Sequence, residues 1–264
     1  MQHTNSILKV FVGLFFLLNA ITGQAQLRCV VLDAGHGGHD PGAVGKLFKE
    51  KDIALSIAKK VGQLLEADFP EMKVVYTRKT DAFVELHKRA AKANAVNADL
   101  FISIHVNAME RKNSHIEGTE VFVMGAHVKD ENLRVAKLEN KAILLEKDYK
   151  KHYDGFDPNS PEGNIAMNMV QNAYLDHSLN LASMVSDSFK KRAKRTNRGV
   201  HSAGFMVLKT ATMPSILIEC GYISNPEEEL FLGSEEGQNK LAESIFFAIR
   251  KYQVSVIKTM KMAD

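Results

Sequence analysis

The chain has 264 residues, 45% apolar and 25% charged, which favours a soluble globular domain over a disordered or membrane-embedded protein. A formal net charge of +3 is too small to indicate nucleic-acid binding, although it permits an anionic polymer as ligand. Two cysteines are too few for the disulfide framework of a small secreted domain.

The first 25 residues are typical of a secretory signal peptide. A lysine precedes an apolar run at 10–18, and a small-residue cleavage site ends at Ala25. The run is shorter than the ~20 residues of a membrane-spanning helix, so no stable membrane anchor is expected after leader removal. We therefore expect a secreted, periplasmic or cell-envelope protein with one domain at 26–257 and a frayed tail at 258–264.

Short apolar runs alternate with helical stripes along the rest of the chain. The runs predict buried strands at 28–32, 72–76, 100–104, 119–123 and 215–218. The stripes predict one helix from Asp52, a second capped by Thr80 or Asp81, and a closing helix over 241–252. This order predicts an α/β fold: a single domain with a mainly parallel twisted sheet and helices on both faces.

The segment from about 125 to 181 differs from this pattern. It combines a charge-dense helical stretch at 128–151, a turn-rich piece at 153–161 and a return to helix near Asn164. A strand-helix-strand crossover does not need this length, so we interpret the segment as an inserted, mostly helical element. Insertions of this kind often serve as lids or partner-binding elements.

The two cysteines lie within strand-like runs. Cys29 belongs to the first predicted strand, and Cys220 follows the last one. A single disulfide is conceivable in an exported chain. Their apolar surroundings favour two buried free thiols instead.

Ionisable side chains follow three of the predicted strands. His36 lies in a glycine-bearing turn after the first strand, His105 ends the third, and Glu219 ends the last. Ligands gather at the carboxyl ends of strands in an open parallel sheet, so these side chains are expected to share one cleft. Glu50, at the start of the first helix, can reach the same place.

Two imidazoles and one carboxylate form a known catalytic ligand set for zinc, which suits His36, Glu50 and His105. Glu219 would then be the unattached carboxylate that accepts a proton from water. Each residue also has a simpler explanation: the histidines could be structural, and Glu50 could be a solvated helix start. Glu219 is harder to explain, because a carboxylate after Ile-Leu-Ile is costly unless it is paired, protonated or bound to a cation.

Four separated motifs resemble the zinc-dependent N-acetylmuramoyl-L-alanine amidase family (amidase type 3). They are Val-Leu-Asp-Ala-Gly-His-Gly-Gly-His-Asp-Pro-Gly-Ala (31–43), Glu-Lys-Asp-Ile-Ala-Leu (50–55), Ser-Ile-His-Val-Asn (103–107) and Pro-Ser-Ile-Leu-Ile-Glu-Cys-Gly-Tyr-Ile-Ser-Asn-Pro (214–226). They occur in the family's order and cover nearly the whole domain.

The resemblance implies zinc (Zn2+) held by His36, Glu50 and His105, with Glu219 as the catalytic carboxylate. It implies peptidoglycan as the substrate and hydrolysis of the amide between N-acetylmuramic acid and L-alanine, in cell-wall remodelling or cell separation. A wall-binding module without catalysis and a zinc hydrolase of another amide, such as a peptide, are the alternatives. The intact four-residue set argues against the first, and only the resemblance argues against the second.

The inserted segment also has a counterpart in this resemblance. In some members an inserted helix covers the zinc and is displaced by an activator protein. The charged helix that contains Glu139 and Glu146 is our candidate for such a cover, with an activator acting on 125–181. The alternative is a passive wall of the substrate groove.

Overall fold

The computed structural model describes residues 27–126, 129–153, 156–157, 160 and 173–263. The expected signal peptide, 1–25, lies outside the described residues. Leu27–Tyr252 form one compact unit, which contains the whole sheet. No helix in the described part of the chain is long and apolar enough to cross a membrane.

Six strands form one sheet in the order β2-β1-β3-β6-β4-β5. Their bounds are β1 Cys29–Ala34, β2 Lys73–Tyr76, β3 Leu100–Asn107, β4 Thr119–Met124, β5 Asn197–Ala203 and β6 Ser215–Tyr222. All neighbours pair in parallel except β4 and β6, which are antiparallel. The sheet is therefore mainly parallel, as the sequence predicts.

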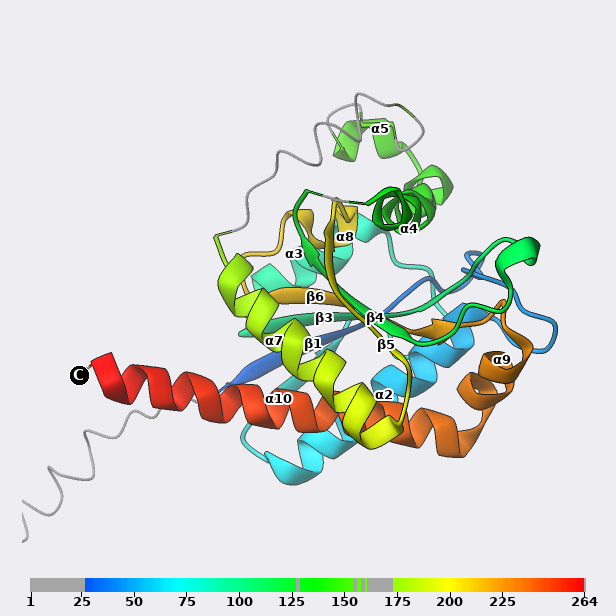
Figure 1. Cartoon of the computed structure of the whole chain (residues 1–264). Coiled ribbons are helices and arrows are strands. Elements are labelled where there is room, and N and C mark those ends of the chain that lie inside the picture. Colours follow the sequence, from blue (N-terminus) through cyan, green and yellow to red (C-terminus); the bar gives the residue numbers. More distant parts are fainter. Residues whose placement is uncertain (1–26, 127–128, 154–155, 158–159, 161–172, 264) are drawn as a thin grey trace, which may run out of the picture. The chain divides into compact units, whose positions relative to one another are not determined.

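Helices cover both faces of this sheet (Figure 1). Their bounds are α2 Glu50–Asp68, α3 Leu86–Ala95, α4 Asp130–Asn140, α5 Tyr149–His152, α7 Leu175–Ser188, α8 Met206–Lys209, α9 Pro226–Gly233 and α10 Glu235–Ala263, with the short 3₁₀ helices η1 Arg111–Asn113 and η2 Lys141–Leu145 and the short π-helix η3 Phe189–Ala193. α2 packs on β1, β2 and β3, and α7 packs on β4, β5 and β6. α3 and α8 lie against the other face, where Phe101, Phe122 and Leu217 join a buried cluster.

The register places three acidic or basic side chains in one row on that second face. His105 in β3 pairs with Glu219 in β6, and Glu219 pairs with Glu120 in β4. Residues directly opposite each other on neighbouring strands point to the same side of the sheet. The row therefore runs from His105 through Glu219 to Glu120.

The structure corrects two predicted elements. The second helix begins at Leu86 rather than at Thr80 or Asp81, and Asp81 instead accepts hydrogen bonds from Gly38 N (2.7 Å) and Lys51 Nζ (2.7 Å). The helical stretch at 128–151 is divided into α4, η2 and α5, with Asp148 in a left-handed conformation (φ 56°) before α5.

Both cysteines are free and buried, as expected. Cys29 begins β1 and Cys220 lies in β6. The α10 helix extends through most of the expected tail, 258–264, whose fraying stays a prediction.

Candidate metal centre

His36 stands in a tight turn directly after β1. Its backbone is left-handed (φ 58°), which few residues other than glycine adopt, and the neighbouring Gly37 and Gly38 also have positive φ. Its Nδ1 lies 2.8 Å from Asp40 Oδ2, so the ring can donate there and leave Nε2 free for a ligand. The turn and Asp40 together fix the direction of the imidazole.

Arg89 and Arg78 stabilise this turn by donating hydrogen bonds to its backbone carbonyl oxygens. Arg89 donates to the carbonyl oxygens of Ala34 (2.8 Å) and His36 (2.9 Å) and pairs with the buried Asp33 (2.9 Å). Arg78 donates to carbonyl oxygens, including that of Gly35 (2.7 Å). Asp33 and Arg89 therefore form a buried ion pair beside the turn, whereas Arg78 binds the backbone.

Glu50 reaches the site from the first turn of α2. Its Oε1 accepts from Val106 N (2.9 Å) and lies 3.0 Å from His105 Nδ1, while Oε2 accepts from Ala43 N (2.7 Å). The same Oε1 lies 3.2 Å from His36 Nε2. The side chain is 1% exposed, so the simpler explanation of a solvated helix start is wrong.

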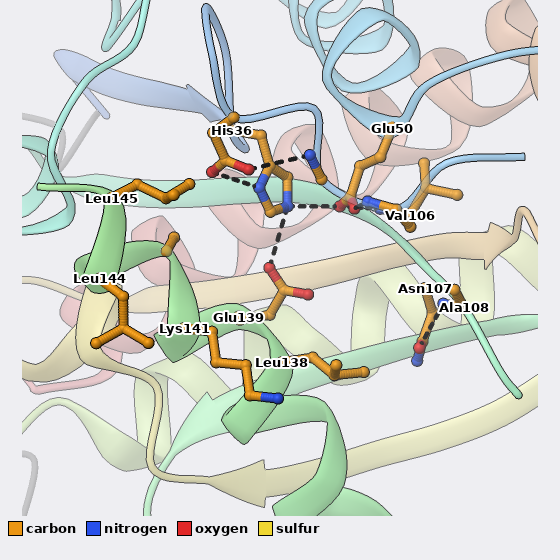
Figure 2. A pocket seen from close by; sticks show the side chains of 14 residues that line it. His36, Glu50, Val106, Asn107, Ala108, Leu138, Glu139, Lys141, Leu144 and Leu145 are labelled. Carbon is orange, nitrogen blue, oxygen red and sulfur yellow. Dashed lines mark hydrogen bonds and ion pairs between the residues drawn. The ribbon is translucent and has the colours of Figure 1, made fainter. Parts of the chain in front are cut away.

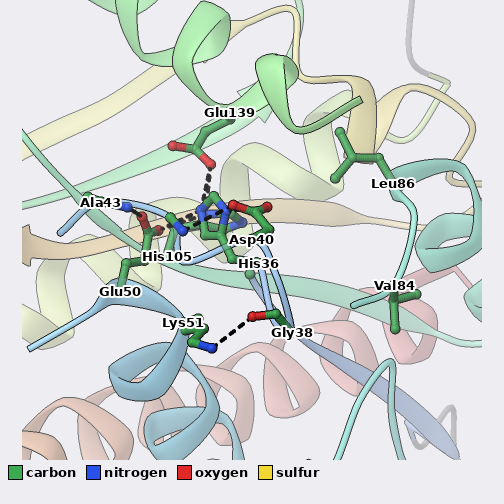
Figure 3. A network of polar contacts seen from close by, with 12 residues as sticks. His36, Gly38, Asp40, Ala43, Glu50, Lys51, Val84, Leu86, His105 and Glu139 are labelled. Carbon is green, nitrogen blue, oxygen red and sulfur yellow. Dashed lines mark hydrogen bonds and ion pairs between the residues drawn. The ribbon is translucent and has the colours of Figure 1, made fainter. Parts of the chain in front are cut away.

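Glu139, from α4, completes the cluster (Figure 3). Its Oε2 lies 2.9 Å from His105 Nδ1 and 3.2 Å from His36 Nε2. One donor atom from each of His36, Glu50, His105 and Glu139 lies within 4.8 Å of the others, a spacing suited to a single metal ion. The structure thus brings together the three predicted ligands and adds a fourth candidate ligand, the carboxylate of Glu139.

Two glycines make room for this cluster. A Cβ at Gly35 would lie 2.4 Å from His105 Cε1, and a Cβ at Gly42 would lie 2.5 Å from His36 Cδ2. Neither distance is tolerated between carbon atoms, so both positions require glycine. The close approach of backbone and rings keeps the imidazoles in place.

The charges of the cluster stabilise one another. Burial opposes protonation of His105 more than any single neighbour favours it, but the charges and hydrogen bonds of Glu139 and Glu50 together outweigh burial and raise the pKa of His105 to about 10. Burial likewise opposes protonation of His36, and the charge of Glu50 raises its pKa well above the ordinary value. The neighbouring His36 conversely lowers the pKa of Glu50 despite burial. Without a metal, two imidazolium ions balance the two carboxylates.

Glu219 differs from the other acidic side chains. It is fully buried, and neither carboxylate oxygen has a hydrogen-bond partner among the described residues. Burial, followed by the charge of Glu139, raises the pKa of Glu219 well above its ordinary range. Such a group is suited to accept and return a proton near neutral pH.

A pocket of about 430 Å³ opens beside the cluster (Figure 2). His36 and Glu50 line one side, Asn107 and Ala108 line a second, and Leu138 and Glu139 of α4 close a third. The cluster can therefore be approached from this pocket, while α4 lies against it.

Two residues of the site were not assigned a role there from the sequence. Asp40 orients His36, and its four-residue spacing from His36 within the glycine loop could have indicated this. Glu139 was identified only as part of a covering helix, because no sequence spacing connects it to the strand-end residues. Glu146, the other acid of that predicted helix, binds Leu86 N (2.6 Å) instead.

Comparison with known proteins gives a consistent result. The family model described as N-acetylmuramoyl-L-alanine amidase matches residues 30–251. AmiC of Escherichia coli O6:H1 is 36% identical over 87% of this chain, which spans 54% of AmiC. AmiA of Escherichia coli K12 is 33% identical over 85% of this chain and 76% of AmiA.

Solved structures extend this likeness to the fold. The N-acetylmuramoyl-L-alanine amidase of Clostridium difficile 630 matches with a TM-score of 0.64 and 29% identity, over 88% of this chain and 99% of that one. CwlD of Clostridioides difficile, solved in complex with the GerS lipoprotein, matches with a TM-score of 0.62 and 28% identity, over 86% and 99%. The family match and these relatives support N-acetylmuramoyl-L-alanine amidase activity on peptidoglycan. The chain belongs to the N-acetylmuramoyl-L-alanine amidase family.

Proposed function

We propose that this protein is a zinc-dependent hydrolase that cleaves the amide between N-acetylmuramic acid and L-alanine, in cell-wall remodelling or cell separation. The observation that carries the proposal is the convergence of His36, Glu50 and His105 beside the unpartnered, buried Glu219. Two imidazoles with one carboxylate are a ligand set of catalytic zinc sites. Export to the periplasm or cell envelope is part of the proposal, because its substrate lies there.

The donor atoms fit zinc in their chemical type, and two of them lack an aligned hydrogen bond among the described residues. His36 Nε2 and Glu139 Oε2 are buried and lie within ion-pair distance of the cluster, but neither makes an aligned hydrogen bond in the described part of the chain, and the cluster contains no thiolate. His36, Glu50 and His105 would hold the ion. Zinc bound there supplies a Lewis acid that polarises the scissile carbonyl and lowers the pKa of water to about 7.

Glu219 would carry the proton in this reaction. Its carboxylate accepts a proton from the water that attacks the lactyl carbonyl carbon, and then returns it to the L-alanine nitrogen as the C–N bond breaks. The buried, unpartnered oxygens favour both steps, because no competing hydrogen bond holds the carboxylate in its ionised form.

Glu139 would act as a removable cover. Its carboxylate is 12% exposed and contacts both imidazoles, so it occupies the side from which substrate would approach. Since α4 belongs to the segment 125–181, a partner that displaces the segment would open the site. We propose an activator protein in this role; the CwlD relative was solved with a lipoprotein partner.

The decisive experiment is mass spectrometry of the products from purified peptidoglycan, with and without a chelator. Whole stem peptides beginning with L-alanine are expected, and the chelator should abolish their release. Shorter peptides would indicate an endopeptidase, and unchanged release with the chelator would contradict the zinc proposal. No release by any form of the enzyme would favour a wall-binding module.

Two variants test the assigned roles. Glu219→Gln should retain zinc and lose about 10²- to 10⁴-fold in kcat, the usual contribution of a general base. The exposed Glu227→Gln is the matched control and should keep wild-type turnover.

Glu139→Gln should raise basal hydrolysis, as should deletion of the segment, and unchanged basal activity in both would exclude the cover.

A further inference from the structure

The contacts between α4 and the sheet extend beyond the metal cluster. Three side chains on one face of α4 make polar contacts: Glu131, Arg134 and Glu139. Their spacing of three and then five residues keeps them on one side of a helix. Glu131 and Glu139 are eight residues apart, which corresponds to about 12 Å along the helix axis.

Arg198 receives the carboxylate at the far end of this face. Its Nη2 donates to Glu131 Oε1 (3.0 Å), and its Nε donates to Glu120 Oε1 (2.9 Å). Glu120 is buried (3% exposed) and also accepts from Asn107 Nδ2 (3.2 Å), so it fixes the inner edge of the guanidinium. Glu131 is 37% exposed, and because it is a residue of α4, its contact with Arg198 is lost when α4 moves away.

Arg134, in the middle of this face of α4, occupies two hydrogen-bond acceptors of the segment that ends β3. Arg134 donates to the carbonyl oxygen of Ala108 (2.9 Å) and approaches Asn107 Oδ1 (3.3 Å). Both residues also line the pocket beside the cluster. Removal of α4 would therefore expose, in sequence, the metal cluster, a pair of acceptors and the outer edge of a cationic side chain.

A ligand that replaces α4 must provide the same groups in the same order. A peptide offers amide N–H groups to the acceptors, and a carboxylate matches the guanidinium edge that Glu131 leaves. Glu120 lies two strands from His105 in the row across the sheet, a separation of about 10 Å, which an extended peptide covers in about three residues.

We propose that Arg198, positioned by Glu120, determines specificity by binding a free carboxylate of the stem peptide two to three residues from the scissile amide. This inference rests on the proposed function, because it takes the stem peptide as the ligand that replaces α4. Glu131 is then a stand-in for the substrate carboxylate. Arg198 binds this group in the ground state and in the transition state and takes no part in the chemistry.

The test uses three N-acetylmuramoyl tripeptides: one with both stem carboxylates free, one amidated at the second residue and one amidated at the third. kcat and KM are measured for zinc-loaded Glu139→Gln and for Glu139→Gln with Arg198→Gln. One of the two amidations should lower kcat/KM about tenfold or more in the parent, mainly through KM, as expected for a lost charge-assisted hydrogen bond. The same amidation should have less than a twofold effect when Arg198 is absent.

Two further variants separate recognition from stability. Arg198→Lys keeps the charge and should retain part of the preference, while the exposed Lys194→Gln, which removes a positive charge just before β5 in the sequence, should leave the preference unchanged. Equal cleavage of all three substrates by the parent would overturn the inference and leave the amidase proposal standing. An equal loss on all three substrates in Arg198→Gln would also overturn it. Failure to cleave any of them would contradict the proposed function instead.

Discussion

At the residue scale, Glu219 combines its proposed chemical role with a cost in stability. A carboxyl that is buried without a partner disfavours its ionised form, and the charge of Glu139 adds to this effect. The unfolded chain has neither constraint. At a pH above the ordinary pKa of this group, the metal-free protein must either take up a proton at Glu219 on folding or bury its negative charge. Both cost free energy of folding.

We expect Glu219→Gln to stabilise the metal-free protein at pH 8 but not at pH 4.5. The folded-state pKa is raised, so wild-type stability falls as pH rises above the unfolded pKa of about 4.3, and glutamine removes this loss. The gain at pH 8 should be roughly 1–3 kcal/mol, the scale of a buried unsatisfied group. Thermal unfolding in a chelator at both pH values checks this, with the exposed Glu243→Gln as control. An equal shift at both pH values would contradict the assignment.

Gly35 gives a second prediction at this scale. In Gly35→Ala the added Cβ would meet the His105 ring at 2.4 Å, so the ring must move away from the position it shares with His36 and Glu50. Zinc affinity should fall by at least tenfold although no ligand is changed, as for lost supporting contacts around metal sites. Chelator competition measures this. The control is Gly125→Ala, where the nearest atom would be 3.3 Å away, and equal affinities in the two variants would refute the argument.

At the element scale, Glu146 joins the segment after α4 to the start of α3. Its carboxylate is completely buried and accepts from Leu86 N (2.6 Å) and from Tyr153 Oη (2.8 Å to each oxygen), and it lies 3.3 Å from His87 Nδ1. It thereby satisfies the first backbone N–H of α3 from a position 60 residues away in sequence. This attachment is separate from that of Glu139.

We expect Tyr153→Phe to loosen the segment without changing the metal cluster. The change removes one donor from a buried carboxylate, at a cost of about 1–3 kcal/mol that falls on the η2 and α5 contacts. Amide hydrogen exchange should become faster in α4 and η2 but not in β1 or β3, and basal hydrolysis should rise. Tyr149→Phe is the matched control, since Tyr149 makes no contact with Glu146 in the described contacts. Unchanged exchange in α4 would show that Glu146 does not anchor the cover.

The strands whose burial is nearly complete are among those that the sequence predicted well. β1, β3 and β6 are apolar at most positions and buried throughout, so their runs stand out without further information. β5 was not predicted, because it is only half-buried and its sequence, Asn-Arg-Gly-Val-His-Ser-Ala, contains two apolar residues. Among the strands of the described residues it pairs only with β4, at the edge of the sheet. An edge strand of this kind is fixed by tertiary pairing rather than by its own pattern.

The residues of the site also divide into those that the sequence pattern identifies and those whose position depends on tertiary contacts. His36, His105 and Glu219 could be identified because each follows a recognisable strand, and the parallel arrangement brings strand ends together. The approach of Glu139 could not be derived, because it depends on how a separate helix docks on the cleft. The start of α3 was misplaced for a related reason: its first backbone N–H is satisfied by Glu146, far away in sequence, rather than by a local cap.

At the scale of the whole molecule, zinc binding should couple to both protonation and folding. In the metal-free protein the carboxylates raise the pKa of both imidazoles, that of His105 to about 10, so both are protonated at neutral pH. These protons contribute stability that is fully present below the unfolded pKa of about 6.5 and is lost as pH rises toward 10. Zinc requires the neutral imidazoles, so it must displace the protons and stabilises only the folded chain.

We therefore expect zinc binding at pH 7 to release about two protons, and its affinity to rise with pH between 6 and 8. Calorimetric titration in two buffers of different ionisation enthalpy counts the protons. Glu139→Gln should release fewer, because the charge that most raises the pKa of His105 is gone, whereas the exposed Glu227→Gln should match the wild type. At a zinc concentration 100-fold above the Kd at pH 7, the folded protein should gain about 2.7 kcal/mol, and the same zinc concentration should give a larger gain at pH 8, where Kd is lower. Binding without proton release would mean that the ion does not occupy the position between His36 and His105, and it would remove the basis for Glu139 as the group that competes with substrate there.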